Sequence, residues 1–139
     1  MITKKMIDTL EKSEFINVAT CDFNGKPNAA PKFVLKVSGN FVYLVDYTIG
    51  TTWRNVRVNP KVSLSFVDHN TLTGYQLNGE ACIVDKGPAY KKMRKEMHDK
   101  EIRLTTKHII EDVRGGVEHE TFEVLIRDQF IILKVLHVS

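Results

Sequence analysis

A short polar segment, GTTWRN at residues 50–55, combines residue types that can hold an anion. Gly50 lets backbone amides approach a ligand closely, and Thr51 and Thr52 offer hydroxyl donors. If a helical turn begins here, its N-terminal end also favours negative charge. A plain turn in which Thr52 caps the following helical turn explains the same residues. The segment alone therefore leaves both interpretations open.

Three further polar residues lie in the strand-like runs on either side of this segment. Lys32 and Lys36 share one run, from which either ammonium group could reach a phosphate or the edge of a ring system. Gln76 could donate its side-chain amide to a ring carbonyl. Each of the three is also explained as a polar strand residue that faces solvent.

The familiar sequence signatures of several enzyme classes are absent from the chain. The sequence contains no HExxH, GxSxG, GxxxxGK[ST] or GxGxxG pattern. None of the five histidines stands at metal-ligand spacing from a second ligand, and the acidic residues are scattered. We therefore expect no metal site, and no catalytic acid, base or nucleophile can be named from the sequence.

Composition indicates one soluble domain spanning residues 1–139. Hydrophobic residues make up 42% of the chain and charged residues 27%, which is ordinary for a globular protein. The net charge of +3 is too small to indicate a nucleic-acid-binding protein, and no predicted strand face interleaves cations with aromatic rings. Lysines and arginines crowd residues 89–107, but acidic residues stand among them. We interpret this segment as a solvated amphipathic helix packed on the rest of the domain.

Cysteine usage and the N-terminal sequence favour a cytoplasmic protein that does not bind membranes. Cys21 and Cys82 lie in apolar runs without a CxxC motif, which predicts two reduced, buried thiols. The N-terminal residues lack the apolar run of a signal peptide. No stretch approaches the roughly 18 apolar residues of a transmembrane helix.

The first third of the chain predicts a short helix and a three-stranded meander. Residues 3–12 have helical spacing, with Thr3 as the N-cap. Residues 15–21, 27–37 and 41–46 are strand-like. Asn24-Gly25 predicts a tight turn between the first two strands.

The rest of the chain predicts further strands, interrupted by helices. We expect a short helix at 52–58 and strands at 61–67 and 74–85, with a bulge or bend at Gly79. A longer helix at 89–110 and strands at 121–126 and 130–138 follow. Six or seven strands at short intervals, without a βαβ rhythm, predict a small antiparallel barrel with helices at its ends.

The order and spacing of three segments resemble those of a known family. These are FINVATCDFNGKPNAAPKFVLKVSGNFVYLVD, GTTWRNVRVNPKVSLSF and GYQLNGEACIVDKGPAYKKM, which together run from Phe15 to about Tyr90. The chain resembles the pyridoxamine 5′-phosphate oxidase-like superfamily, the flavin-binding split-barrel proteins, and is most similar to the small FMN-binding proteins. The resemblance implies a mainly β fold, a six-stranded antiparallel split barrel of Greek-key type.

The resemblance also implies a function. It implies a homodimer with an FMN in each of two sites between the subunits, and electron or hydride transfer with a small-molecule redox partner such as a reduced nicotinamide. Alternatives on the same fold bind a deazaflavin or haem, or act as non-catalytic stress-response modules. Residues for the substrate phosphate of a true pyridoxamine phosphate oxidase are not recognisable near the C-terminus, so that specific activity is not expected.

The resemblance assigns roles to particular positions. Backbone groups of Ala29, Ala30 and Pro31 would face the polar edge of the flavin ring, with support from Lys32. The remaining implied contacts are Val45, Asp46 and Thr48 with the ribityl chain and phosphate, Thr51, Thr52 and Asn55 with the phosphate, and Gln76 with the flavin.

One position departs from the family pattern. Relatives commonly carry a lysine or arginine where this chain has Thr51. A cation from elsewhere must then meet the phosphate charge, and the candidates are Lys32, Lys36, Arg54 and Arg57.

Overall fold

The computed structural model describes residues 2–114 and 130–138. It divides into two compact units, one made of Met1–Asp85 with Gln129–Ser139 and the other of Lys86–Asp128. The first unit holds the strands and two short helices, and the second holds the long helix. The prediction of one domain over the whole chain stays a prediction.

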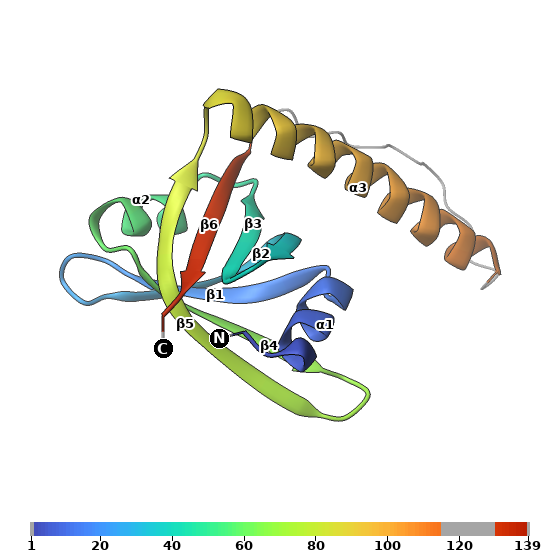
Figure 1. The fold of residues 1–139 in the computed structure, drawn as a ribbon, viewed down its shortest axis with the longest axis horizontal. Helices are drawn as coiled ribbons and strands as arrows, with labels where there is room; N and C mark the ends of the chain where they lie inside the picture. Colours follow the sequence, from blue (N-terminus) through green and yellow to red (C-terminus); the bar gives the residue numbers. More distant parts are fainter. Residues whose placement is uncertain (1, 115–129, 139) are drawn as a thin grey trace. The chain divides into compact units, whose positions relative to one another are not determined.

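Six strands close into an antiparallel barrel (Figure 1). Around the barrel the order is β1, β2, β3, β6, β5, β4, so the last three strands lie in the reverse of their chain order. The predicted mainly β, six-stranded antiparallel barrel is confirmed. The strands are β1 (Phe15–Cys21), β2 (Pro27–Ser38), β3 (Phe41–Asp46), β4 (Lys61–Asp68), β5 (Thr73–Val84) and β6 (Ile131–His137).

The barrel core follows from the period-two alternation of the strands. Along β1 and β4, every second side chain is buried and the residues between them are more exposed. Fully buried residues from different strands meet in one cluster, including Val18, Leu44, Leu64, Leu77 and Leu133. Burying one such aliphatic side chain stabilises the fold by about 1.5–3 kcal/mol.

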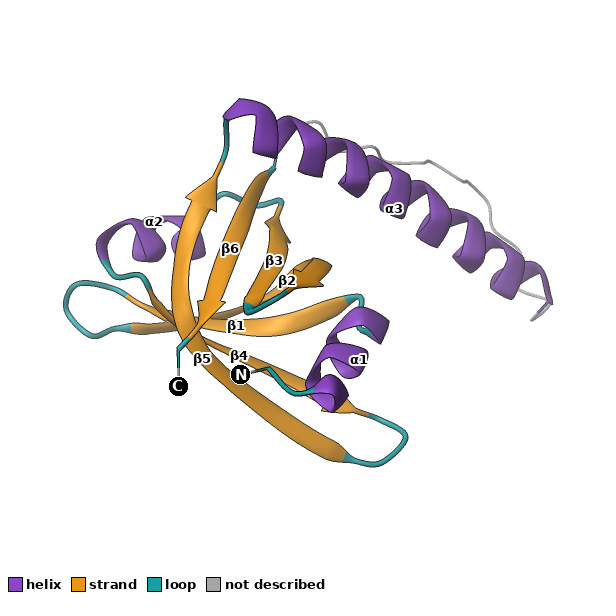
Figure 2. Ribbon diagram, viewed as in Figure 1, coloured by secondary structure: helices purple, strands orange, loops and turns teal. Residues whose placement is uncertain are grey.

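Two short helices, α1 (Lys4–Lys12) and α2 (Thr51–Val58), lie on opposite sides of the barrel (Figure 2). The predicted cap of α1 is confirmed, because the Thr3 hydroxyl accepts a hydrogen bond from the Met6 amide at 3.3 Å. In the β1–β2 connection, Gly25 has a φ of 84°, and the Asp22 carboxylate accepts bonds from the Asn24 and Lys26 amides at 2.8 Å. The predicted turn is therefore also confirmed.

The predicted long helix is α3 (Gly87–Arg114). Its predicted packing against the barrel stays a prediction. The predicted strand at 121–126 lies outside the described residues, whereas the strand predicted at 130–138 is β6. Within the described part of the chain, no helix has the length and apolar character needed to cross a membrane.

The expectation of two buried thiols is wrong. Cys21 is half-buried and Cys82 is exposed. Both residues occupy outward positions of the alternation, since their strand neighbours Thr20 and Ala81 are the buried ones. An apolar composition in a strand did not reveal which face each residue occupies.

The irregularity predicted at Gly79 takes another form. The register between β5 and β4 runs through Gly79 without a shift, and pairing between β5 and β6 starts at Gly79. The bulge lies instead in β2, between Val34 and Lys36. Glycine at position 79 allows β5 and β6 to approach closely, because a Cβ atom there would stand 2.3 Å from the Leu136 carbonyl oxygen of β6.

Replacing Gly79 with alanine should therefore destabilise the barrel. The added methyl group meets backbone rather than a flexible side chain, so we expect Gly79→Ala to lower the free energy of unfolding by about 1–3 kcal/mol. Gly74→Ala in the same strand is the matched control, because nothing lies within 4 Å of its would-be Cβ. Urea unfolding measures both variants, and equal stability of the two would contradict the close-approach argument.

Candidate functional site

The connection from β3 to α2 leaves the start of α2 without a side-chain cap. Gly50 occupies the N-cap position and provides no side-chain hydrogen bond. The prediction that Thr52 caps the helix is wrong, because the helix already begins at Thr51 and Thr52 lies inside its first turn. Ile49, just before the cap, has a φ of 46°, a left-handed conformation that is strained for a β-branched residue. The first amide groups of α2 therefore have no acceptor from a capping side chain.

The two faces of α2 have different environments. Thr52, Asn55 and Val56 are buried. The side-chain amide of Asn55 donates a hydrogen bond to the Thr20 hydroxyl of β1 at 3.0 Å, which anchors the helix to the barrel. The Thr52 hydroxyl oxygen is also buried, yet it has no hydrogen-bond partner among the described residues.

The outward face of α2 carries two cations. Arg54 donates from Nη2 to the Thr51 hydroxyl at 3.0 Å, which places its guanidinium at the first turn. Arg57 lies over the Trp53 ring, with its Cζ 4.5 Å from the ring centroid. The helix sequence contains no acidic residue, so the helix dipole and Arg54 make this N-terminus electropositive, whereas Arg57 lies in the last turn.

A buried ion pair lies where β3 ends. Lys32 Nζ stands 2.8 Å from Asp46 Oδ1, and the two side chains are 6% and 0% exposed. The same carboxylate oxygen accepts hydrogen bonds from the Thr48 backbone amide at 3.0 Å and from the Thr48 hydroxyl at 2.9 Å. Lys32 also lies 3.3 Å from the Thr48 hydroxyl. The interpretation of Lys32 as a solvent-facing lysine is therefore wrong.

The Asp46 carboxyl group stays ionised despite its burial. Burial acts to raise its pKa, but the hydrogen bond and charge of Lys32, with the hydrogen bonds of Thr48, hold the pKa below its ordinary value of 3.8. The second oxygen, Oδ2, is buried without a partner among the described residues. Because Asp46 neutralises Lys32 locally, Lys32 is poorly suited to meet a phosphate.

The first half of β2 has an edge without a strand partner. Residues 27–33 pair with β1 on one side, whereas pairing with β3 starts only at Phe33. Among the described strands, the second edge of residues 27–32 is thus unpaired. Ala29, Ala30 and Pro31 lie in this segment, with Ala29 and Pro31 exposed and Ala30 half-buried. The backbone N–H and C=O groups on that edge are therefore available to form hydrogen bonds with a ligand.

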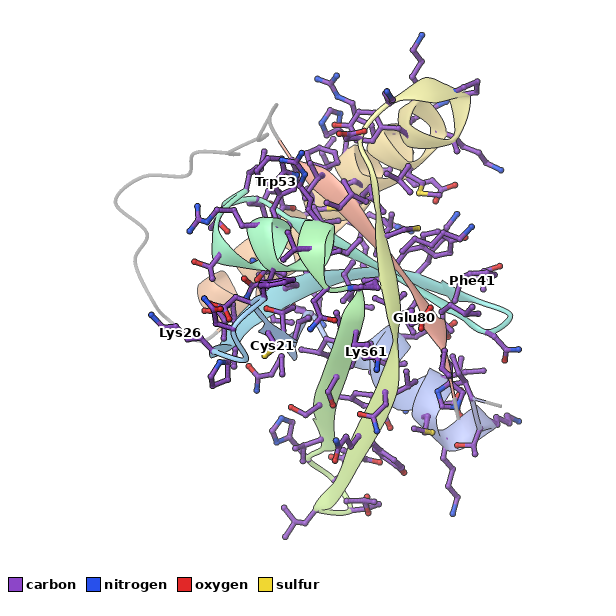
Figure 3. The ribbon with its side chains drawn as sticks, turned by 90° about the vertical axis from the view of Figure 1, so that its left-hand side faces the viewer. Cys21, Lys26, Phe41, Trp53, Lys61 and Glu80 are labelled. Atoms are coloured by element: carbon purple, nitrogen blue, oxygen red, sulfur yellow. The ribbon has the colours of Figure 1, made fainter. Side chains whose placement is uncertain are left out.

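An outer face of small and polar side chains continues from this segment across β1, β4 and β5. One row across the four strands is Pro31, Asn17, Ser65 and Gln76, all exposed. The next row is Ala29, Ala19, Ser63 and Asn78. Figure 3 shows Cys21, Lys61 and Glu80 on β1, β4 and β5 at the end of this face. We call the two rows together the outer face.

Two grooves mark the outer face. One, of about 590 Å³, runs along residues including Phe15, Pro31 and Gln76. The other, of about 430 Å³, includes Ala19, Cys21 and Asn78. The Gln76 amide donates to Ser63 at 3.1 Å and Asn78 at 3.2 Å, so it belongs to a network on this face.

Two lysines stack on aromatic rings of neighbouring strands. Lys36 lies 5.3 Å from the Tyr43 ring centroid, and Lys134 lies 4.3 Å from that of Phe41. Tyr43 pairs with both Lys36 and Lys134 across β2, β3 and β6. The expectation that no strand face interleaves cations with aromatic rings is therefore wrong, although both ammonium groups are engaged by these rings.

The predicted site residues form three groups and one outlier. Lys32, Asp46 and Thr48 are in contact, and Val45, fully buried, pairs with Phe33 and Ile132. The α2 group is Thr51, Thr52 and Asn55, and the group that reaches the outer face is Ala29, Ala30, Pro31 and Gln76. Lys36 lies beyond the β2 bulge and joins none of them through the contacts described above.

Sequence reasoning missed the partners that hold these groups. Thr20 anchors Asn55, and Ser63 and Asn78 bind Gln76. The sequence signal that bears on these partners is the period-two alternation of side chains along a strand. It places Thr20 on the same face as Val18, and Ser63 on the same face as Ser65. In the described part of the chain, no group of three or more His, Cys, Asp or Glu side chains is arranged to hold a metal ion.

Comparison with known proteins gives a family match and many similar folds. A sequence profile of the family described as pyridoxamine 5′-phosphate oxidase matches residues 2–119. None of the curated proteins compared with the chain matches it. Among solved structures, HupZ from Group A Streptococcus is 25% identical with a TM-score of 0.66, and the alignment covers 100% of this chain and 90% of that one.

Two more distant structures share the fold. HutZ, a haem storage protein from Vibrio cholerae, is 14% identical with a TM-score of 0.66 and is aligned over 99% of this chain and 91% of its own. An FAD-binding protein from Mesorhizobium loti is 16% identical with a TM-score of 0.61, with coverage of 99% and 91%. At these identities the similarity shows the fold alone.

Replacing only one member of the Lys32–Asp46 pair should destabilise the fold severely, because the other member is then buried without its partner. Either Lys32→Met or Asp46→Asn leaves one buried group without its charged partner, and we expect a loss of about 3–5 kcal/mol in the free energy of unfolding. The double variant should lose clearly less than the sum of the two single variants. Additive losses in urea unfolding would contradict a coupled buried pair.

The pair also sets an acid limit on stability. Because the folded-state pKa of Asp46 is lowered, its ionised form stabilises the fold above pH 3.8, and this contribution is lost as pH falls through the folded-state value. Unfolding midpoints should therefore fall more steeply below about pH 4 for the wild type than for Asp46→Asn. Parallel pH profiles would contradict the assignment.

Proposed function

We propose, from the premise that this chain belongs to the pyridoxamine 5′-phosphate oxidase family, that it is an FMN-binding flavoprotein of the oxidoreductase class. The observation that carries the proposal is the start of α2. There an uncapped helix N-terminus, the Thr51 hydroxyl and the Arg54 guanidinium lie together on an exposed surface. This combination suits a phosphate group.

The unpaired edge of β2 suits the ring of the cofactor. A flavin ring presents carbonyl and N–H groups along one edge, and backbone groups of Ala29, Ala30 and Pro31 can complement them. The residues around Asp46 and Thr48 connect this edge to α2, in the position where the ribityl chain would run. Lys32 then acts by holding the connection in place through Asp46 rather than as a free cation.

The outer face suits a second copy of the chain. Ala19, Ala29, Ser63 and Ser65 have small side chains, which allow two sheets to approach closely. Phe15 is 56% exposed beside this face, and burying it would favour association. In the proposed homodimer, each flavin lies between the unpaired β2 edge of one subunit and the other subunit.

The chemistry would belong to the cofactor. Bound FMN supplies electron or hydride transfer, and the redox partner would be a small molecule, such as a reduced nicotinamide. The residues of this chain bind the phosphate, orient the ring and exclude water at the subunit interface. Haem is the competing cofactor, and its Soret band distinguishes it from a flavin spectrum in protein purified from cells.

Binding of FMN should depend on the Thr51 hydroxyl. Hydrogen bonds to charged groups contribute about 1.5–3 kcal/mol, so Thr51→Ala should weaken FMN binding roughly tenfold or more. Riboflavin lacks the phosphate, and its affinity should stay within about twofold. Flavin fluorescence quenching measures both ligands.

Thr71→Ala is the matched control, because Thr71 is an exposed threonine in the β4–β5 hairpin. It should leave both affinities unchanged. A wild-type protein that quenches neither flavin would refute the cofactor proposal. Equal weakening of FMN and riboflavin by Thr51→Ala would refute the phosphate role of this threonine.

The dimer should depend on the small side chains of the outer face. Ala19 is exposed within a barrel strand, so Ala19→Arg should fold normally while preventing close approach of the second copy. Sedimentation velocity should show a wild-type dimer at micromolar concentration and a monomer for this variant. Asn40→Arg, in the exposed β2–β3 turn, is the control and should remain dimeric. A monomeric wild type would rule the proposed interface out.

A further inference from the structure

We propose that Arg54 supplies the positive charge that meets the cofactor phosphate, where the family resemblance implies a cation at the position that is Thr51 in this chain. This inference rests on the proposed function and deepens it, because it names the residue that makes the site selective for a phosphorylated flavin. It follows from the contacts of the four candidate cations and from the hydrogen-bond capacity of the first turn of α2.

The contacts of the candidate cations distinguish them. Lys32 is buried and paired with Asp46 at 2.8 Å, so its charge is already compensated. Lys36 lies over Tyr43, on the part of β2 that pairs with β3. Arg57 lies over Trp53, toward the C-terminal end of α2. Arg54 is the candidate whose guanidinium is held at the first turn of the helix.

The Arg54–Thr51 contact leaves donors available in the right place. The Thr51 oxygen accepts the bond from Arg54 Nη2, so the hydroxyl proton remains able to donate to a second acceptor. A guanidinium has five N–H donors in a planar fork, and this contact uses one of them. Both residues are exposed, so a phosphate can receive bonds from the hydroxyl and the guanidinium together.

A second observation marks the same turn as incomplete. Thr52 is only 2% exposed, and its hydroxyl oxygen has no hydrogen-bond partner among the described residues. Buried hydroxyl groups are normally paired. In addition, no acidic side chain lies in α2, so nothing within the helix compensates the charge of Arg54. The turn therefore combines an unsatisfied polar group with a cation that no acidic residue of the helix compensates.

Arg54→Gln tests the inference on the full chain, with Arg57→Gln as the matched control. Both arginines are exposed residues of the same helix, and both variants remove one positive charge. FMN and riboflavin titrations by flavin fluorescence quenching should show FMN weakened about 10–100-fold by Arg54→Gln, with riboflavin within about twofold. Arg57→Gln should weaken FMN less than about threefold, since it removes only long-range charge.

A salt series provides a second readout. FMN binding to the wild type should weaken as the salt concentration rises, because salt screens the attraction between the phosphate and Arg54. Arg54→Gln removes this charge, so its FMN affinity should depend less on salt. Thermal melting should show both variants folded like the wild type, since neither arginine is buried.

The outcomes separate this inference from the proposed function. If the wild type binds FMN but Arg54→Gln weakens FMN and riboflavin equally, or not at all, the inference is overturned and the proposed function stands. A larger FMN-specific loss in Arg57→Gln would also overturn it, in favour of Arg57. If the wild type binds neither flavin, both the inference and the proposed function are overturned.

Discussion

The Asp46 carboxylate lies at the end of β3 and binds both a residue of β2 and a residue of the connection to α2. One of its oxygens accepts hydrogen bonds from the Lys32 ammonium group, the Thr48 backbone amide and the Thr48 hydroxyl, all within 3.0 Å. These bonds join the unpaired half of β2 to the first residues after β3. The helix α2 begins at Thr51, a few residues further along the chain. A buried ion pair contributes little net stability but is costly to break, which suits a role in fixing geometry.

Electrostatics divide the candidate site into a neutral part and a positive part. The Lys32–Asp46 pair is neutral and lies beside the β2 edge, where a flavin ring would lie. The exposed face of α2 carries Arg54 and Arg57, and the helix contains no acidic residue. Arg54 lies at the first turn, the helix end that itself favours anions. A molecule with a flat, uncharged ring and a phosphate tail matches this division. Haem, with two carboxylates close to a large ring, matches it less well.

Local signals in the sequence were sufficient for much of the fold. Thr3 caps α1, Asn24-Gly25 makes the first hairpin turn, and the alternating run at residues 61–67 forms β4, because each depends on residues close in the chain. The helix start at Gly50 was missed because threonine is usually the better cap. Here the strained backbone at Ile49 leads directly into Gly50.

The candidate site was less predictable because its contacts are long-range. Burial of Lys32 depends on Asp46, fourteen residues later, and Asn55 depends on Thr20, thirty-five residues earlier. No periodicity in the sequence reports such pairs. The site residues that the family resemblance implies stay predictions, and the contacts of the arginines are what favour Arg54 among the candidate cations.

Phosphorus-31 NMR of FMN bound to the protein tests the central claim most directly, because it observes the phosphate itself. A free phosphomonoester has a second pKa of about 6, and a nearby cation favours its dianionic form. The account predicts a shifted resonance whose titration midpoint moves below that of free FMN. A resonance and a midpoint identical to those of free FMN, in a complex whose flavin fluorescence is quenched, would contradict the claim that α2 holds the phosphate.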